Sequence, residues 1–239
     1  MSKRNPADER PTSANHKVLL IPFEPKLYNS EIDRFINAET KLTAREIKHK
    51  FRDGLNEQFY KSFKAQKFGV IDMMEDTVKF KKDLEGIYQY IRYEYVKIPD
   101  QNNYKAPVKE KEEKKIEKGQ LAVETNSDQR FMDARFSSPK VVSVLQSKYK
   151  TDLFICFNQL DILNSGSKGP MDLGTGSPNR KIVLHYTVFN SAGKEINSGT
   201  VEQEFEPELN NPKKIIDKYF SKISLVVLQR VNKCLNITG

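Results

Sequence analysis

A short apolar run near the N-terminus, Lys17–Phe23, limits most strongly how this chain can fold. The run ends at a proline, with a polar tail before it and a polar segment after it. Because no polar residue alternates with the apolar ones, we predict a strand buried on both faces, as in the centre of a helix-covered sheet. The later segments are then expected to pack around this strand.

A long amphipathic helix is predicted next, after an irregular stretch in which residues 30–36 could form a short helix. Thr43 and Glu46 have the spacing of a capping box at its start. Gly54 is expected to weaken the helix by about 1 kcal/mol relative to alanine. Apolar residues recur at four-residue steps and form one stripe, which we interpret as core rather than as a partner-binding face: Ile47, Phe51, Leu55, Phe59 and Phe63.

Residues 68–74 follow as a second buried strand. A strand, a crossover helix and a second strand make a right-handed βαβ unit, so we expect these two strands to be parallel. A second helix is predicted from about Lys82 to Tyr95, with Leu84, Ile87, Ile91 and Tyr95 facing inward. Its end is rich in tyrosine and in cations, which suits either an amphipathic helix flank or a stacking site for single-stranded nucleic acid: Tyr88, Tyr90, Tyr93, Tyr95, Arg92 and Lys97.

The segment from about 96 to 138 interrupts this pattern. Residues 109–119 are almost all charged and of nearly balanced sign, so they are compatible with a solvated helix, a disordered insertion or a docking arm. Ser138 and Pro139 then have the pattern of a helix start. A short helix ending near Tyr149 is predicted, with an inner face of Val141, Val142, Val144 and Leu145.

The last part of the chain predicts three strands and a helix. Residues 152–163 form a strand that is expected to start in the core and to emerge at an edge, and a glycine-rich loop covers 164–180. Residues 182–189 and 195–205 predict a β-hairpin. A final helix opens at Asn210 or Asn211, with Pro212 at its first position.

The predicted fold class is therefore α/β (α+β). It has a central mixed β-sheet of about five strands with helices packed against it, one βαβ unit, and a C-terminal hairpin plus helix. We expect residues 1–16 to be a flexible tail and residues 17–239 to form a single domain with a charged insertion at about 96–138.

Composition restricts the partners. The net charge of +8 favours association with polyanions such as nucleic acid, anionic lipid or cell-wall polymer, although a solvated lysine-rich surface explains the same excess. Cys156 and Cys234 lie in apolar segments and are expected to be buried thiols. His16, His49 and His185 lack metal-ligand spacing. We predict no metal and no cofactor.

Catalysis needs titratable groups that converge on a substrate. His185 lies in a predicted strand and Asp161 could approach it, but no nucleophile motif such as G-x-S-x-G accompanies them. The glycines at 166–176 do not have the spacing of a phosphate-binding loop. We therefore predict that the protein is not an enzyme and assign no catalytic residue; ligand-binding residues remain unassigned.

The order of elements has a counterpart in known proteins. Ile21-Pro22-Phe23 closes the first strand, Phe68–Asp72 forms the second, Thr151–Phe154 introduces the third, and Ser191–Glu195 makes the hairpin turn. This pattern resembles the small α/β domains of bacterial envelope lipoproteins: the curli-secretion lipoprotein CsgG, the lipoprotein activators of penicillin-binding proteins, and the N-terminal domain of TolB. The chain departs from the pattern in lacking the lipid-bearing cysteine and in its longer segments 96–138 and 164–180.

The resemblance implies a non-catalytic interaction or assembly module, a periplasmic or outer-membrane-associated adaptor or lipoprotein component. Its expected partner is another envelope protein or the cell-wall polymer. That location requires removal of a signal or lipid anchor; otherwise we expect a cytoplasmic protein. A cytoplasmic protein that binds single-stranded nucleic acid is the first alternative, and an enzyme whose active site the sequence does not reveal is the second. No window is apolar enough for a transmembrane span, and the sequence does not predict the oligomeric state.

Overall fold

The computed structural model describes residues 12–76, 78–97, 130–164 and 179–237. The strands are β1 (Lys17–Ile21), β2 (Tyr28–Ser30), β3 (Gly69–Asp72), β4 (Ile91–Lys97), β5 (Arg130–Phe136), β6 (Leu153–Asn164), β7 (Arg180–Asn190) and β8 (Glu195–Phe205). The α-helices are α1 (Asp33–Thr40), α2 (Ala44–Ala65), α3 (Lys81–Tyr90), α4 (Pro139–Tyr149), α5 (Pro212–Ile215) and α6 (Ser221–Cys234). Two short 3-10 turns are η2 (Ser13–Asn15) and η3 (Pro25–Leu27), and a π-helical segment, η4 (Ile216–Phe220), joins α5 to α6.

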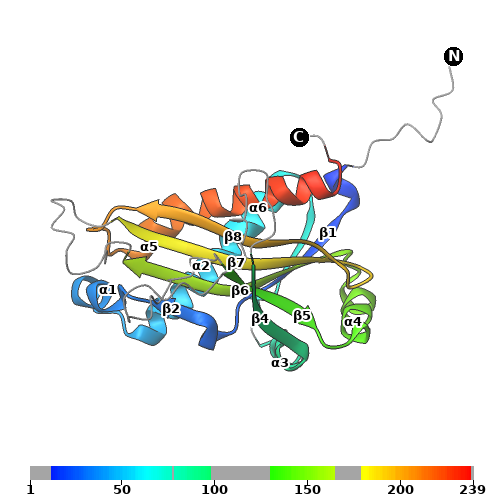
Figure 1. Ribbon diagram of the computed structural model, residues 1–239, viewed down its shortest axis with the longest axis horizontal. Coiled ribbons are helices and arrows are strands. Elements are labelled where there is room, and N and C mark those ends of the chain that lie inside the picture. Colours follow the sequence, from blue (N-terminus) through cyan, green and yellow to red (C-terminus); the bar gives the residue numbers. More distant parts are fainter. Residues whose placement is uncertain (1–11, 77, 98–129, 165–178, 238–239) are drawn as a thin grey trace, which may run out of the picture.

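The main sheet has the order β3-β1-β6-β7-β8, and β2 pairs with β6 beyond the end of β1 (Figure 1). β1 is parallel to both β3 and β6, while β6, β7 and β8 are antiparallel. The predicted mixed sheet, its central first strand, its βαβ unit and its C-terminal hairpin plus helix are confirmed. Among the strands of the described residues, β4 and β5 pair only with each other and form a two-stranded ribbon.

One face of the main sheet, which we call the helix face, is covered by α2 and by the C-terminal helical segments. The predicted stripe of α2 is fully buried there, and the Phe59 ring packs edge-on against Phe157 with ring centroids 4.5 Å apart. Thr43 and Glu46 form the predicted capping box. Gly54 has a packing role: an added Cβ would lie 2.6 Å from Cδ1 of Ile216, so the two helices approach closely because this residue has no side chain.

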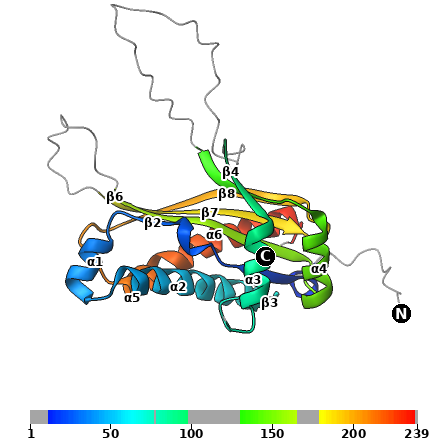
Figure 2. The same ribbon diagram turned by 90° about the horizontal axis from the view of Figure 1, so that it is seen from below.

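The opposite face, which we call the ribbon face, is covered by α3, α4 and the β4–β5 ribbon (Figure 2). Its apolar part packs α3 and α4 against β1 and β6, with Leu19, Ile21, Phe154 and Cys156 inside. The Asn190–Lys194 turn of the hairpin reaches α4, where Gly193 has a positive φ of 73° and lies against Val142. Ser138 caps α4 as predicted.

Several predictions were wrong in detail. The helix expected to end at Tyr95 ends at Tyr90, and the chain continues as β4. Part of the expected insertion, residues 130–136, is a strand rather than a charged arm. The strand at 152–163 does not emerge at an edge, because β1 and β2 flank it on one side and β7 on the other.

Two further boundaries differ. Val144 is 62% exposed instead of facing inward, since the short α4 buries only Val142 and Leu145 in the core. The described residues include part of the expected tail: the backbone carbonyl of His16 accepts from Gly69, and its ring contacts Asp152. Residues 1–11, the charged run at 109–119 and most of the 164–180 loop lie outside the described residues. Within the described residues, no helix has the length and hydropathy needed to cross a membrane.

Candidate functional site

The β4–β5 ribbon is attached to the main sheet by side-chain hydrogen bonds that act on defined backbone atoms of β5. Seven residue pairs join its strands, from Ile91↔Phe136 to Lys97↔Arg130. β5 lies over β7, and its tip projects away from the sheet (Figure 2). The segment 98–129 connects the two strands in sequence and lies outside the described residues.

A buried threonine forms the first attachment. Thr187, on β7, donates its hydroxyl proton to Asp133 at 2.8 Å and accepts from the backbone N–H of Ala134 at 3.1 Å. Asn158 donates both to Thr187 at 2.7 Å and to the carbonyl of Met132 at 2.8 Å. Asn158 is the extra residue of a β-bulge in β6, which turns its side chain toward β5. The sheet thus bonds directly to the backbone of β5.

A histidine forms the second attachment. The Nδ1 atom of His185 accepts from the backbone N–H of Met132 at 2.9 Å, so its proton sits on Nε2 and points to Asp161 at 3.1 Å. Burial raises the pKa of Asp161, but hydrogen bonds from His185, Asn29 and Gln159 outweigh it and hold that pKa below its usual value. The sequence suggested that Asp161 could approach His185, and the structure brings the two together.

Both imidazole nitrogens of His185 are thus engaged inside the fold. A catalytic histidine paired with a carboxylate uses its second nitrogen on a nucleophile or substrate. Here the backbone of β5 occupies that nitrogen, and His185 is only 4% exposed. This arrangement positions the ribbon.

The free edge of the ribbon follows from these contacts. The backbone groups of Met132 and Ala134 that face away from β4 bond to sheet side chains. In an antiparallel pair, opposite residues direct their N–H and C=O groups either both inward or both outward. Tyr95 and Tyr93, their partners, therefore direct these groups to the outer side of β4. Those groups form no backbone hydrogen bond with any described residue.

The tyrosine-rich stretch divides between the interior and the surface. Tyr88 donates to the Pro22 carbonyl at 2.7 Å, and burial raises its pKa to about 12 despite the neighbouring Arg52. Burial also raises the pKa of Tyr93. Tyr90 and Tyr95 are 50% and 52% exposed. The four tyrosines, for which the sequence left a helix flank and a stacking site open, are thus divided between the interior and the surface, which leaves at most two for solvent.

The carboxyl end of β1 is a place where open α/β sheets often bind ligands. In this chain, side chains of the protein itself cover the carboxyl end of β1. Arg52 donates to the Phe23 carbonyl at 2.7 Å and to the Tyr88 hydroxyl at 2.8 Å. Glu24, 8% exposed, forms an ion pair with Lys26. These contacts close the backbone bend between β1 and β2.

The remaining candidates are dispersed. His16 contacts Asp152, while His49 is exposed on α2. Burial raises the pKa of the Cys156 thiol, as expected for a core cysteine, but Cys234 is exposed, because it lies near the end of α6 and donates to the carbonyl of Ile196. The described residues contain no group of three or more histidine, cysteine or acidic side chains placed to hold a metal ion.

Sequence reasoning missed most of the polar residues under the ribbon. Asn158, Thr187 and Asp133 lie in strands or beside the charged insertion, where nothing in the local pattern marks them. One signal was available: Asn158, Gln159 and Asp161 interrupt the apolar run of β6, and polar residues within an otherwise buried strand need partners.

Comparison with known proteins does not place the chain in a family. No protein-family model matches the sequence, and no curated protein matches it.

Proposed function

We propose that the protein is a non-catalytic interaction module of a bacterial envelope, and that a partner binds at the outer edge of β4. The observation that carries the proposal is the ribbon's asymmetry. Its β5 side is bonded to the sheet by His185, Thr187 and Asn158, whereas its β4 side has backbone groups at Tyr93 and Tyr95 that bond to no backbone group of the described residues. An open strand edge is a template for an added strand.

Charge on the ribbon supports this reading. Arg92 lies directly opposite Arg135, and Glu94 lies opposite Asp133, so the ribbon contains two like-charge cross-strand pairs. Such pairs are destabilising. Arg135 contacts Glu94 at 3.9 Å and Asp133 at 3.5 Å, which offsets the acidic pair. An added strand that places an acidic residue beside Arg92 relieves the arginine pair, so we expect an extended segment of a partner protein with an acidic residue at that position.

The envelope location rests on the resemblance of the sequence pattern. Three of its residues have clear roles in the fold. Pro22 ends β1, Asp152 accepts the backbone N–H of Lys17 at 2.6 Å, and Gly193 supplies the positive φ of the hairpin turn.

The test is a proline scan of the free edge in the organism that makes the protein. A photo-cross-linking amino acid at exposed Arg92 is expected to capture a defined partner in the envelope fraction. Tyr95→Pro removes one outward N–H without breaking the β4–β5 ladder and is expected to abolish the capture. Tyr95→Phe keeps that N–H and loses the same 2.9 Å bond to Gln159, so it should retain the partner.

Equal capture by the Tyr95→Pro and Tyr95→Phe variants would contradict partner binding at this edge. Recovery of the wild-type protein only in the soluble cytoplasmic fraction would contradict the envelope location and favour the nucleic-acid alternative.

A further inference from the structure

Exposed lysines gather at the end of the molecule where β1, β3 and β6 begin. Lys67 follows α2, Lys150 follows α4, and Lys194 lies in the hairpin turn. Strand pairing places these lysines at the same end of the sheet. Lys17, at the start of β1, is beside Gly69 of β3 and donates to the Tyr149 carbonyl at 2.9 Å. Leu153, at the start of β6, pairs with Asn190 at the end of β7. The right-hand side of Figure 1 shows α4, the hairpin turn and the start of β1 together.

Two of the acidic groups at this end are bound by cations or backbone within the fold, while Glu195, next to Lys194, is exposed and accepts from the Ser198 hydroxyl. Asp152 is held by His16 and by the backbone of Lys17, and Asp83 by Lys148 and Tyr149. Lys67, Lys150 and Lys194, which we call the lysine triad, are exposed and form no ion pair with any described residue. Their charge is therefore available to an outside partner.

The far end of the sheet differs. There lysines pair with neighbouring carboxylates, as in Lys218–Glu206, Lys213–Asp217 and Lys181–Glu202. Lysines without an ion pair to any described residue also occur elsewhere, such as Lys41, Lys50 and Lys214, so the lysine triad is distinguished by its position where β1, β3 and β6 begin.

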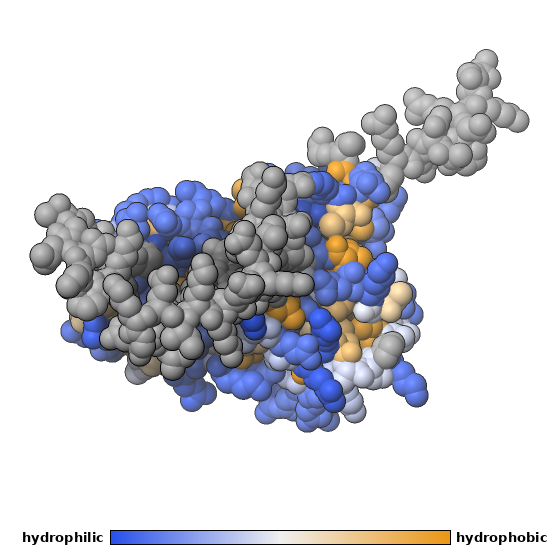
Figure 3. All heavy atoms as spheres, in the orientation of Figure 1, coloured by the Kyte–Doolittle hydropathy of each residue, from blue (hydrophilic) through white to orange (hydrophobic). Residues whose placement is uncertain are grey.

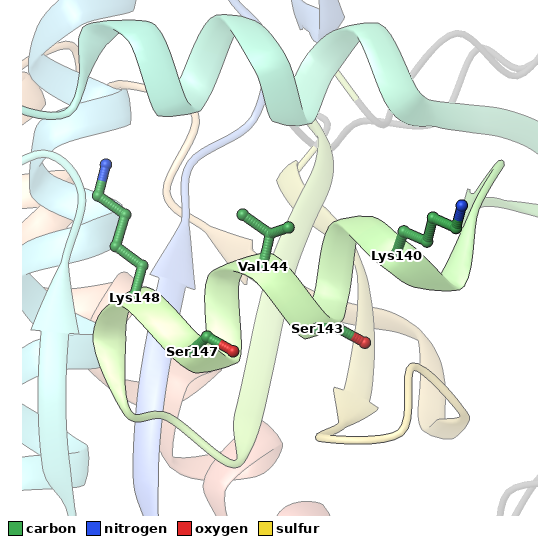
Figure 4. Close-up of a pocket in the computed structure, with 5 residues that line it drawn as sticks. All are labelled: Lys140, Ser143, Val144, Ser147 and Lys148. Carbon is green, nitrogen blue, oxygen red and sulfur yellow. The ribbon is translucent and has the colours of Figure 1, made fainter.

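Helix α4 adds an apolar group to the cationic end. Lys140, Val144 and Lys148 lie at four-residue steps on its outer side, so an exposed valine stands between two lysines (Figure 4). These residues line a broad shallow hollow of about 590 Å³ with Ser143 and Ser147. Figure 3 shows hydrophobic and hydrophilic residues side by side on the right-hand part of this face.

We propose that this end, the lysine triad together with the outer stripe of α4, docks on an anionic lipid bilayer. Lysine ammonium groups suit a diffuse layer of headgroup phosphates, because each acts as a hydrated point charge rather than a bidentate fork. A valine among lysines suits the boundary between headgroups and acyl chains. Single-stranded nucleic acid instead needs aromatic stacking groups in a basic groove. The half-exposed Tyr90 and Tyr95 lie at the end of α3 and on β4, not beside the lysine triad.

Vesicle co-sedimentation of the full chain tests the proposal. We expect binding to vesicles of phosphatidylglycerol and phosphatidylcholine, a steep loss of binding as salt rises, and no binding to pure phosphatidylcholine. Each lysine near an anionic surface adds roughly fivefold to binding, so Lys67→Glu, Lys150→Glu and Lys194→Glu together should weaken it by at least about a hundredfold.

A charge-matched control separates location from net charge. Lys41, Lys50 and Lys214 are exposed at other places, and Lys41 has a positive φ of 62°, like Lys67 at 67°. Replacing this set with glutamate changes the net charge by the same amount as replacing the triad. The control variant should lose binding only a few-fold. In a Lys140→Ala background, the additional change Val144→Asp is expected to weaken vesicle binding further. Circular dichroism should show that the single and the double variant are both folded.

Three results would overturn the proposal: no binding of the wild-type chain to the anionic vesicles, equal losses in the triad and control variants, or a loss of single-stranded DNA binding in the triad variant with vesicle binding intact. The outcome is independent of the β4 edge. The triad variant should still capture the protein partner through Arg92, and Tyr95→Pro should still bind vesicles.

Discussion

The two faces of the sheet are covered in different chemical ways. On the helix face, α2 and α6 bury an almost wholly apolar layer against β6, β7 and β8. On the ribbon face, β5 is held over the same strands by the side chains of Asn158, His185 and Thr187. Apolar packing is non-directional and tolerates small shifts, whereas each hydrogen bond fixes a distance and an angle. The helix face therefore contributes most of the stability, and the hydrogen bonds of the ribbon face fix the position of β5.

Removal of a large core ring should give the greatest effect. Phe59 is fully buried between Phe63 and Phe157. Phe59→Ala is expected to reduce the free energy of unfolding by about 3–5 kcal/mol, as measured by urea denaturation. Phe59→Leu should cost less than half as much. A small loss for the alanine variant would show that the helix face is not the main source of stability.

Removal of the threonine hub should act mainly on the ribbon. Thr187→Val keeps the shape of the side chain but removes the donor to Asp133 and one of the two acceptors of Asn158, at a cost of about 2–3 kcal/mol. Hydrogen exchange at Ala134 should accelerate much more than exchange in α2. Thr187→Ser retains the hydroxyl and should behave like the wild type. Uniform acceleration in both places would mean that the two faces unfold as one unit.

A substitution at Gly54 tests how closely α2 approaches η4 at Ile216. An alanine Cβ at position 54 would lie 2.6 Å from the Ile216 side chain, so Gly54→Ala should lower the unfolding free energy by about 1–3 kcal/mol. The control is Gly86→Ala on α3, where nothing lies within 4 Å of the added Cβ. That change should stabilise the protein by about 0.5–1 kcal/mol.

Acidification should produce the smallest change, and it should affect the ribbon face. The folded-state pKa of Asp161 is below its usual value because His185, Asn29 and Gln159 donate to it against the effect of burial. Its stabilisation is therefore present above the unfolded-state pKa, near 4, and is lost as the pH falls through the folded-state value. Urea denaturation at neutral and acidic pH should show a smaller acid-induced loss for Asp161→Asn than for the wild type.

The helix face could be predicted from the sequence, and the β4–β5 ribbon could not. A stripe such as Phe51, Leu55 and Phe59 repeats with the helical period, so its burial follows from local pattern alone. The β5 strand pairs with β4 across the charged insertion, and its anchors lie in β6 and β7. A contact such as Met132 with His185 joins residues far apart in sequence, and no local periodicity encodes it.

The β4 strand shows a second cause of error. Residues 91–95 alternate apolar or aromatic side chains with charged ones, which suits a strand, yet Leu84 and Ile87 favour continuing the preceding helix. The structure changes from helix to strand at Ile91, so that Tyr93 reaches the interior while Arg92 and Glu94 remain exposed. Pairing with β5 determines the boundary.

Amide hydrogen exchange at four residues of the ribbon tests the central claim most directly. If the sheet holds β5 and leaves β4 open, the amides of Met132 and Ala134 should exchange slowly, because His185 and Thr187 accept from them. The amides of Tyr93 and Tyr95 should exchange rapidly in the isolated protein and become protected when the partner binds. Slow exchange at Tyr93 and Tyr95 in the isolated protein, or rapid exchange at Met132 and Ala134, would contradict the account.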